Sequence, residues 1–178
     1  MRTKELARSA LLIAAALALS YMERLFPLNL VVPLPGVKLG LANIVTMFAL
    51  YFLPRRQAFL VLVLRCILGS IFGGGLSGLA MSLTGGILAF WTMALTKRLP
   101  VLSVYGVSML GAAAHNLGQI LAASVLMGSV YTFFYLPFLL LTALATGMIT
   151  GTVSAFTFRA LSAVPERHSG IPRNKRSK

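Results

Sequence analysis

The sequence predicts an all-α integral membrane protein, a bundle of six transmembrane helices with both ends in the cytoplasm. Of its 178 residues 58% are hydrophobic and only 11% are charged, and the mean hydropathy is +0.88. Roughly a quarter of the residues in a soluble domain are charged. This chain cannot cover a water-facing surface to that extent, so its surplus apolar surface must face lipid.

The number of helices follows from the breaks between apolar segments, where proline, glycine or basic residues end a helix. The helices are expected at residues 6–21, 38–53, 57–72, 76–96, 101–127 and 131–161, in one domain over residues 1–162. About 20 residues span a bilayer, so the second and third helices imply tilt or a locally thin bilayer. Pro137 predicts a bend in the last helix.

The chain begins with basic residues and an apolar run, as a signal peptide does, but no clear small-residue cleavage site follows. We expect a retained first helix, with a cleaved signal as the alternative. After this helix, residues 26–36 contain three prolines, which cannot continue a helix. This apolar stretch is expected to pack on the bundle or to cap a cavity. Residues 163–178 are polar and basic, which predicts a disordered cytoplasmic tail.

Basic residues set the orientation, because cytoplasmic loops carry an excess of lysine and arginine. With the N-terminus inside, the cytoplasmic side would carry every lysine and arginine except Arg24, Lys38 and Arg65. The outer turns at 73–75 and 128–129 would carry no charge. An even number of spans in the cell membrane is therefore predicted.

Several function classes are excluded by what the sequence lacks. The net charge of +13 comes from basic residues that lie mostly between apolar segments and in the tail. They do not form the basic face that a nucleic-acid-binding protein presents. No phosphate-binding glycine-rich loop is present, and there is no aspartate. Without paired carboxylates or a Ser-His-Asp triad, we expect no catalytic residues and no cofactor. A lone His115 is a poor metal ligand, so no metal site is expected.

Polar side chains at membrane depth form the candidate substrate-binding site. Arg65 lies ten residues beyond Arg55, about 15 Å along a helix, and an unpaired arginine there is expensive. Polar residues of four predicted helices would gather at middle to outer depth. They are Glu23, Lys38, Asn43, Arg65, His115, Asn116 and Gln119. One interpretation is structural, with Glu23 or a carbonyl neutralising Arg65. The other is an outward-facing pocket for an anionic or hydrogen-bond-rich solute.

Small residues recur four apart on three helices, which lets helix backbones approach closely. The stripes are Ala10, Ala14 and Ala18; Gly78, Ser82 and Gly86; and Ala143, Gly147, Gly151 and Ala155. Packing within the bundle is one interpretation of each stripe. A docking face for another membrane protein is the other, and the first helix is the best candidate for it.

Three motifs resemble a known family. They are Pro-Gly-Val-Lys-Leu-Gly-Leu-Ala-Asn-Ile-Val at residues 35–45, Arg65 followed by Leu-Gly-Ser at 68–70, and Ala-His-Asn-Leu-Gly-Gln at 114–119. The chain resembles, over residues 5–162, the small bacterial membrane proteins labelled "Gx transporter" or "heptaprenyl diphosphate synthase component I". That family is similar in turn to the substrate-binding S-components of energy-coupling-factor transporters.

The resemblance implies a six-helix bundle that binds a vitamin-like solute from outside. Such components pair with a transmembrane coupling protein and two cytoplasmic ATPases, and a small-residue face on the first helix meets the coupling protein. Ala10, Ala14 and Ala18 fall on the matching face. The loop between the first two helices typically gates the pocket, which would give the proline-rich stretch that role.

These observations favour a substrate-binding component of an ATP-driven importer for a small, anionic solute. One alternative is a non-catalytic membrane subunit that serves prenyl diphosphate or quinone synthesis. Because prenyl chain elongation uses aspartate-rich motifs and this chain has no aspartate, it would not be the catalytic subunit. Another alternative is a stand-alone secondary carrier or channel.

Overall fold

The computed structural model describes residues 3–23, 25 and 38–163, and side chains as far as residue 160. Most of the described residues are helical, with no strand among them. The α-helices are α1 (Thr3–Glu23), α2 (Asn43–Phe52), α3 (Arg55–Gly69), α4 (Gly75–Thr96), α5 (Val104–Met127) and α6 (Leu136–Ala163). A π turn, η2 (Ser70–Gly74), joins α3 to α4, and a 3-10 turn, η3 (Val130–Tyr135), precedes α6. The proline-rich stretch and almost all of the basic tail lie outside the described residues.

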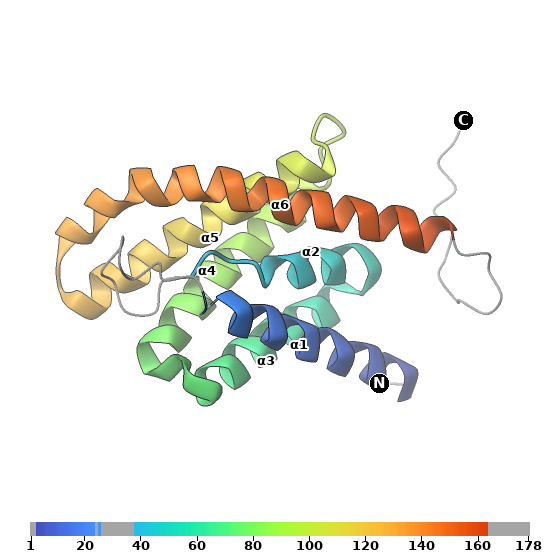
Figure 1. Ribbon diagram of the computed structural model, residues 1–178, viewed down its shortest axis with the longest axis horizontal. Coiled ribbons are helices and arrows are strands. Elements are labelled where there is room, and N and C mark those ends of the chain that lie inside the picture. The colour runs from blue at the N-terminus through green and yellow to red at the C-terminus, as the bar shows by residue number, and fades with distance from the viewer. Residues whose placement is uncertain (1–2, 24, 26–37, 164–178) are drawn as a thin grey trace.

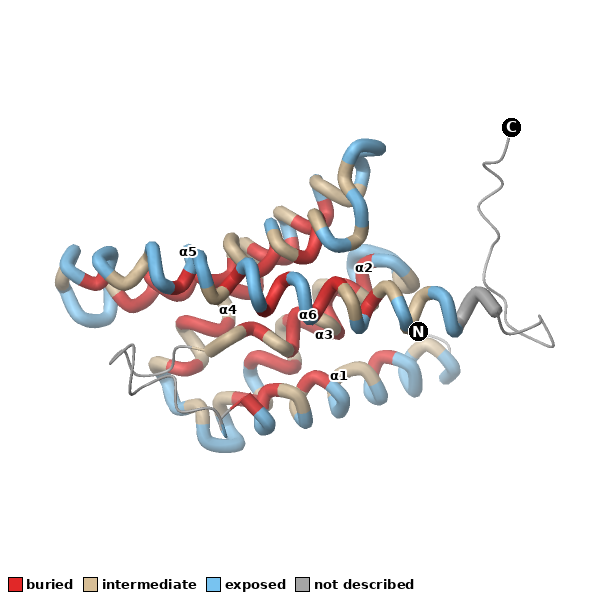
Figure 2. Tube along the Cα trace, turned by 45° about the horizontal axis from the view of Figure 1, so that its top comes forward, coloured by how far each residue is buried: buried red, intermediate tan, exposed pale blue. Residues whose placement is uncertain are grey.

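The helices form one bundle in which α5 packs between α4 and α6, while α1 packs mainly on α3 (Figure 1). The short helix α2 touches α1, α3, α4, α5 and α6, so it lies at the centre. Buried residues concentrate where the helices meet in the middle of the bundle, and α1 is covered least of the four candidate spans (Figure 2). The first residues of α1 and the last residues of α6 lie at the same end of the molecule (Figures 1 and 2).

Four described segments are long and apolar enough to span a membrane, which supports a membrane protein. They are Thr3–Glu23, Arg55–Thr96, Val104–Met127 and Val130–Ala160. The second of these has 42 residues and combines α3 and α4, and α2 has only 10 residues. By length and composition alone the described residues therefore contain four candidate spans, against six predicted.

The predicted start of the second helix is wrong. Residues 38–40 are not helical, and α2 begins only at Asn43. Gly40 has a φ of +87°, a left-handed backbone conformation that interrupts a helix and that glycine adopts without steric cost. Lys38 consequently lies before α2, on a segment without regular secondary structure. The predicted bend near Pro137 takes a different form, because a 3-10 turn ends at Tyr135 and Pro137 lies in the first turn of α6. Proline is well tolerated there.

Glycine lets α4, α5 and α6 approach closely. A Cβ added to Gly118 on α5 would lie 2.6 Å from the Cα of Gly85 on α4, and one added to Gly147 on α6 would lie 2.6 Å from the Cα of Met109. The small-residue stripe on α6 therefore packs inside the bundle. By contrast, Ala10, Ala14 and Ala18 are exposed on α1.

Candidate solute-binding site

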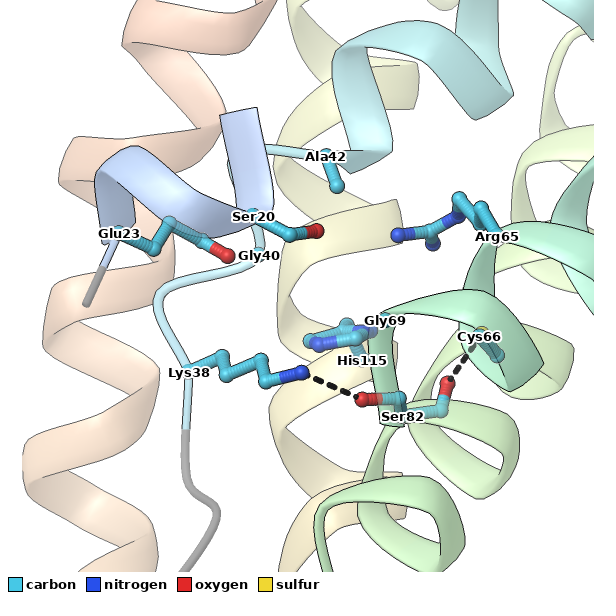
Figure 3. A pocket seen from close by; sticks show the side chains of 10 residues that line it. All are labelled: Ser20, Glu23, Lys38, Gly40, Ala42, Arg65, Cys66, Gly69, Ser82 and His115. Carbon is cyan, nitrogen blue, oxygen red and sulfur yellow. Dashed lines mark hydrogen bonds between the residues drawn. The ribbon is translucent and has the colours of Figure 1, made fainter. Parts of the chain in front are cut away.

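A small polar cavity lies where α1 ends, between the segment 38–42 and helices α3, α4 and α5 (Figure 3). Its lining combines charged and polar side chains with small residues. The lining residues are Ser20, Glu23, Lys38, Gly40, Ala42, Arg65, Cys66, Gly69, Ser82 and His115. The volume is about 10 Å³, which is room for about one water molecule.

Arg65 is a buried positive charge whose hydrogen bonds among the described residues do not account for its burial. The residue is only 7% exposed, and its Nη2 donates a hydrogen bond to Asn43 Oδ1 at 3.2 Å. Its Nε is buried without a hydrogen-bond partner among the described residues, and so is Nδ2 of Asn43. A buried guanidinium normally meets a carboxylate or several acceptors. Here, among the described residues, one neutral amide oxygen is its acceptor.

Two side chains fasten the segment 38–42 to the bundle. The amide of Gln119 pairs with the main chain of Lys38 at both ends: Oε1 accepts from Lys38 N at 2.7 Å, and Nε2 donates to Lys38 O at 2.8 Å. Glu23 Oε1 accepts from the backbone N–H of Leu41. The Lys38 side chain reaches across the cavity, where Nζ donates to Ser82 Oγ at 3.0 Å (Figure 3). Glu23 and Gln119 therefore position the segment that carries Lys38.

Replacing Gln119 with methionine should loosen this segment while keeping the side chain's approximate size. Two hydrogen bonds to the Lys38 main chain would be lost, each worth about 0.5–1.5 kcal/mol. We expect amide hydrogen exchange in residues 38–42 to become at least about 5-fold faster, as measured by mass spectrometry in detergent. The matched control is Gln57→Met in the first turn of α3. Equal exchange in both variants and the wild type would show that Gln119 does not hold the segment.

His115 and Asn116 are neighbours on α5 with different surroundings. His115 is 3% exposed and lines the cavity. It lies against Gly85, where an added Cβ would be 2.7 Å from the His115 carbonyl oxygen and 3.0 Å from Nδ1. Asn116 does not line the cavity. Its Nδ2 donates to the carbonyl of Leu139 on α6 at 2.5 Å, so it ties two helices together.

The structure thus divides the seven predicted binding residues into two groups. Glu23, Lys38, Arg65 and His115 line one cavity. The other three residues do not line it. Asn43 accepts a hydrogen bond from Arg65, Asn116 donates one to α6, and Gln119 accepts one from the Lys38 main chain. In the part of the chain that the structure describes, no three His, Cys, Asp or Glu residues are placed to hold a metal ion.

Sequence reasoning did not assign several residues of the cavity wall to the site. The sequence places Ser82 only among the small residues of the stripe on α4, yet its hydroxyl oxygen accepts a hydrogen bond from the Lys38 ammonium. Ser20 and Cys66 also line the cavity. Cys66 Sγ lies 3.4 Å from the carbonyl oxygen of Ser82. A polar residue within a glycine stripe was the available signal, because such a residue faces the same helix contact as the glycines.

The charges of the cavity suit an anion. Lys38 and Arg65 stand against Glu23, the acidic residue in the lining, so two positive charges minus one negative charge leave one uncompensated. In a site screened from water, such a charge interacts strongly with a carboxylate or phosphate group. The lining offers ammonium, guanidinium and hydroxyl donors, which are the groups that bind such anions.

Comparison with known proteins identifies a family. The model of the family described as "Heptaprenyl diphosphate synthase component I" matches residues 12–157. No curated protein and no solved structure matches the chain. The match covers most of the chain and includes α2 to α5, which carry most of the cavity lining. This protein therefore belongs to the heptaprenyl diphosphate synthase component I family.

Proposed function

We propose that this protein is the solute-binding membrane component of an ATP-driven importer of the energy-coupling-factor type. It binds a small anionic solute from the outside in the cavity around Arg65. A transmembrane coupling protein and two cytoplasmic ATPases, carried on other chains, supply the energy. Buried Arg65 supports this proposal most strongly, because its guanidinium has one neutral acceptor among the described residues and lies beside a second cation.

A vitamin-sized solute needs a pocket of roughly 300 Å³ or more, far above the 10 Å³ of this cavity. Binding therefore requires that a wall moves. The segment 38–42 is a wall outside the helices, and hydrogen bonds with Glu23, Gln119 and Ser82 help to hold it in place. In this proposal, its displacement opens the site and frees Lys38 to contact the solute.

The proposal includes six spans with both ends in the cytoplasm. At 1.5 Å per residue the 42 residues of Arg55–Thr96 would extend about 63 Å, twice the hydrocarbon thickness of about 30 Å. Phe72 and Gly73 leave helical geometry between α3 and α4, which allows the chain to reverse. The first residues of α1 and the last residues of α6 lie at one end of the molecule, as an even number of spans requires (Figure 1).

The exposed alanines of α1 provide the docking face for the coupling protein. Ala10, Ala14 and Ala18 are exposed, and small residues four apart allow close contact with another membrane helix. We expect Ala14→Leu to reduce co-purification of the coupling protein and ATPases from native membranes at least about 5-fold, without changing solute binding. The control is Ala145→Leu, an equal enlargement at an exposed position of α6.

Three results of this experiment would count against the importer or against its docking face on α1. If the wild-type protein never brings down a coupling protein and ATPases, the importer proposal fails. If Ala14→Leu lowers the melting temperature instead of the co-purification, the alanine stripe serves packing inside the bundle. If Ala145→Leu reduces co-purification equally, α1 is not the docking face.

The family description favours a second candidate, a non-catalytic membrane subunit associated with prenyl diphosphate synthesis. An anion site would suit a diphosphate group in that role as well. The two candidates differ in the effect of deleting the gene. The second predicts altered lengths of prenyl chains with normal solute uptake, as measured by mass spectrometry of extracted quinones. Unaltered chains would exclude it.

A further inference from the structure

The cavity around Arg65 adjoins an apolar groove on the surface of the molecule. This groove lies between α1 and the end of α3, and its volume is about 480 Å³. Its lining residues are Leu17, Ala18, Ser20, Tyr21, Gly69 and Phe72. No charged residue is among them, whereas the neighbouring cavity contains Glu23, Lys38 and Arg65. The two sites therefore differ sharply in the chemistry that they would bind.

Ser20 and Gly69 line both the groove and the cavity. They are small residues, so the wall that separates the two sites consists of little more than a hydroxymethyl group and a glycine backbone. A Cβ added to Gly69 would be 3.7 Å from Leu17 Cδ2, an ordinary contact distance, so Leu17 of the groove packs directly over this glycine. One molecule could therefore occupy both sites if its head is anionic and its chain is apolar.

We infer that the solute is a single-chain amphiphilic anion, with its head bound by Arg65 and Lys38 in the cavity and its chain in the groove between α1 and α3. This inference rests on the proposed anion site and adds the class of substrate. Arg65 supplies an observation independent of the groove, because its buried Nε lacks a partner among the described residues. A water-soluble anion would use the cavity alone and would leave the groove to membrane lipid.

The test compares three probes on the full-length protein in nanodiscs of phosphatidylcholine: inorganic diphosphate, farnesyl diphosphate and farnesol. We expect farnesyl diphosphate to bind at least about 10-fold more tightly than inorganic diphosphate. Leu17 lines the groove and not the cavity, so Leu17→Trp should fill the groove and remove this preference, while binding of inorganic diphosphate is unchanged. Leu17→Met is the matched control and should keep the preference. If Leu17→Trp does not fold, Ala18→Phe fills the groove from the neighbouring position of α1.

The outcomes separate this inference from the function on which it rests. If neither diphosphate binds the wild-type protein, the proposed anion site fails and the inference fails with it. If inorganic diphosphate binds as tightly as farnesyl diphosphate, the anion site stands and the amphiphile is overturned. If farnesol competed as well as farnesyl diphosphate, the claim that the site recognises an anionic head would be wrong. If phosphatidylglycerol added to the discs displaced farnesyl diphosphate, the occupant would be a bilayer lipid, and the claim that a solute binds there would be wrong.

Discussion

Replacing Arg65 with methionine is expected to abolish anion binding without destabilising the protein. Truncating a buried charged hydrogen-bonding partner typically costs 2–5 kcal/mol of binding energy, so affinity for inorganic diphosphate should fall at least about 30-fold. Stability should stay equal or rise, because the guanidinium has a single neutral acceptor among the described residues and burying such a charge is unfavourable. Equilibrium binding and thermal unfolding in detergent measure the two effects.

Two further variants show whether the guanidinium itself matters. Arg65→Lys keeps the charge and loses the planar fork of donors, so intermediate affinity is expected. Arg98→Met removes an exposed cation just after α4 and should leave affinity unchanged. If Arg65→Met retained affinity while the melting temperature fell, the arginine would be structural and the binding site would lie elsewhere.

Replacing Gly40 with alanine is expected to damage both the fold and the site. Its φ of +87° is a conformation that costs other residues roughly 1–2 kcal/mol. The added Cβ would also lie 3.0 Å from Asn43 Nδ2 and 3.1 Å from His115 Cδ2. Overpacking typically costs 1–3 kcal/mol more, so a loss of about 3 kcal/mol in the free energy of unfolding is expected. Anion affinity should fall too, because Asn43 holds Arg65.

Gly128→Ala is the matched control for this prediction. Gly128 ends α5 with a φ of +59°, but an added Cβ would meet nothing within 4 Å. This variant therefore measures the backbone term alone, about 1 kcal/mol, and should leave anion affinity intact. If the two variants lost equal stability in denaturant titrations, the crowding of Gly40 against Asn43 and His115 would be refuted.

The helices were largely predictable from the sequence because their apolar segments are long and their breaks are strong. The predicted ends of most helices fall within a few residues of those observed. The second helix was the exception, since its first residues contain Lys38 and Gly40 in a run that reads as apolar and helical. Gly40 takes a left-handed conformation here, and no pattern of hydrophobicity encodes that choice. Helix length alone does not give the number of spans either, because α2 has only 10 residues and a spanning helix needs about 20.

The candidate site was predictable as a set of residues but not as an arrangement. Polar side chains at membrane depth are rare and face the interior, which is why Arg65, Lys38 and His115 can be grouped from the sequence alone. Which of these residues line the cavity and which hold other residues in place depends on three-dimensional geometry. Gln119 pairs with the Lys38 main chain and Asn116 with a carbonyl of α6, and sequence spacing does not reveal main-chain partners. That these residues bind a solute stays a prediction.

Native mass spectrometry of the wild-type protein and Arg65→Met, both purified gently from native membranes, shows directly whether Arg65 holds a solute. We expect the wild-type protein to retain a bound anionic molecule and Arg65→Met, folded to the same extent, to have lost it. The same adduct at the same occupancy on both proteins would contradict the claim that the buried guanidinium holds the solute.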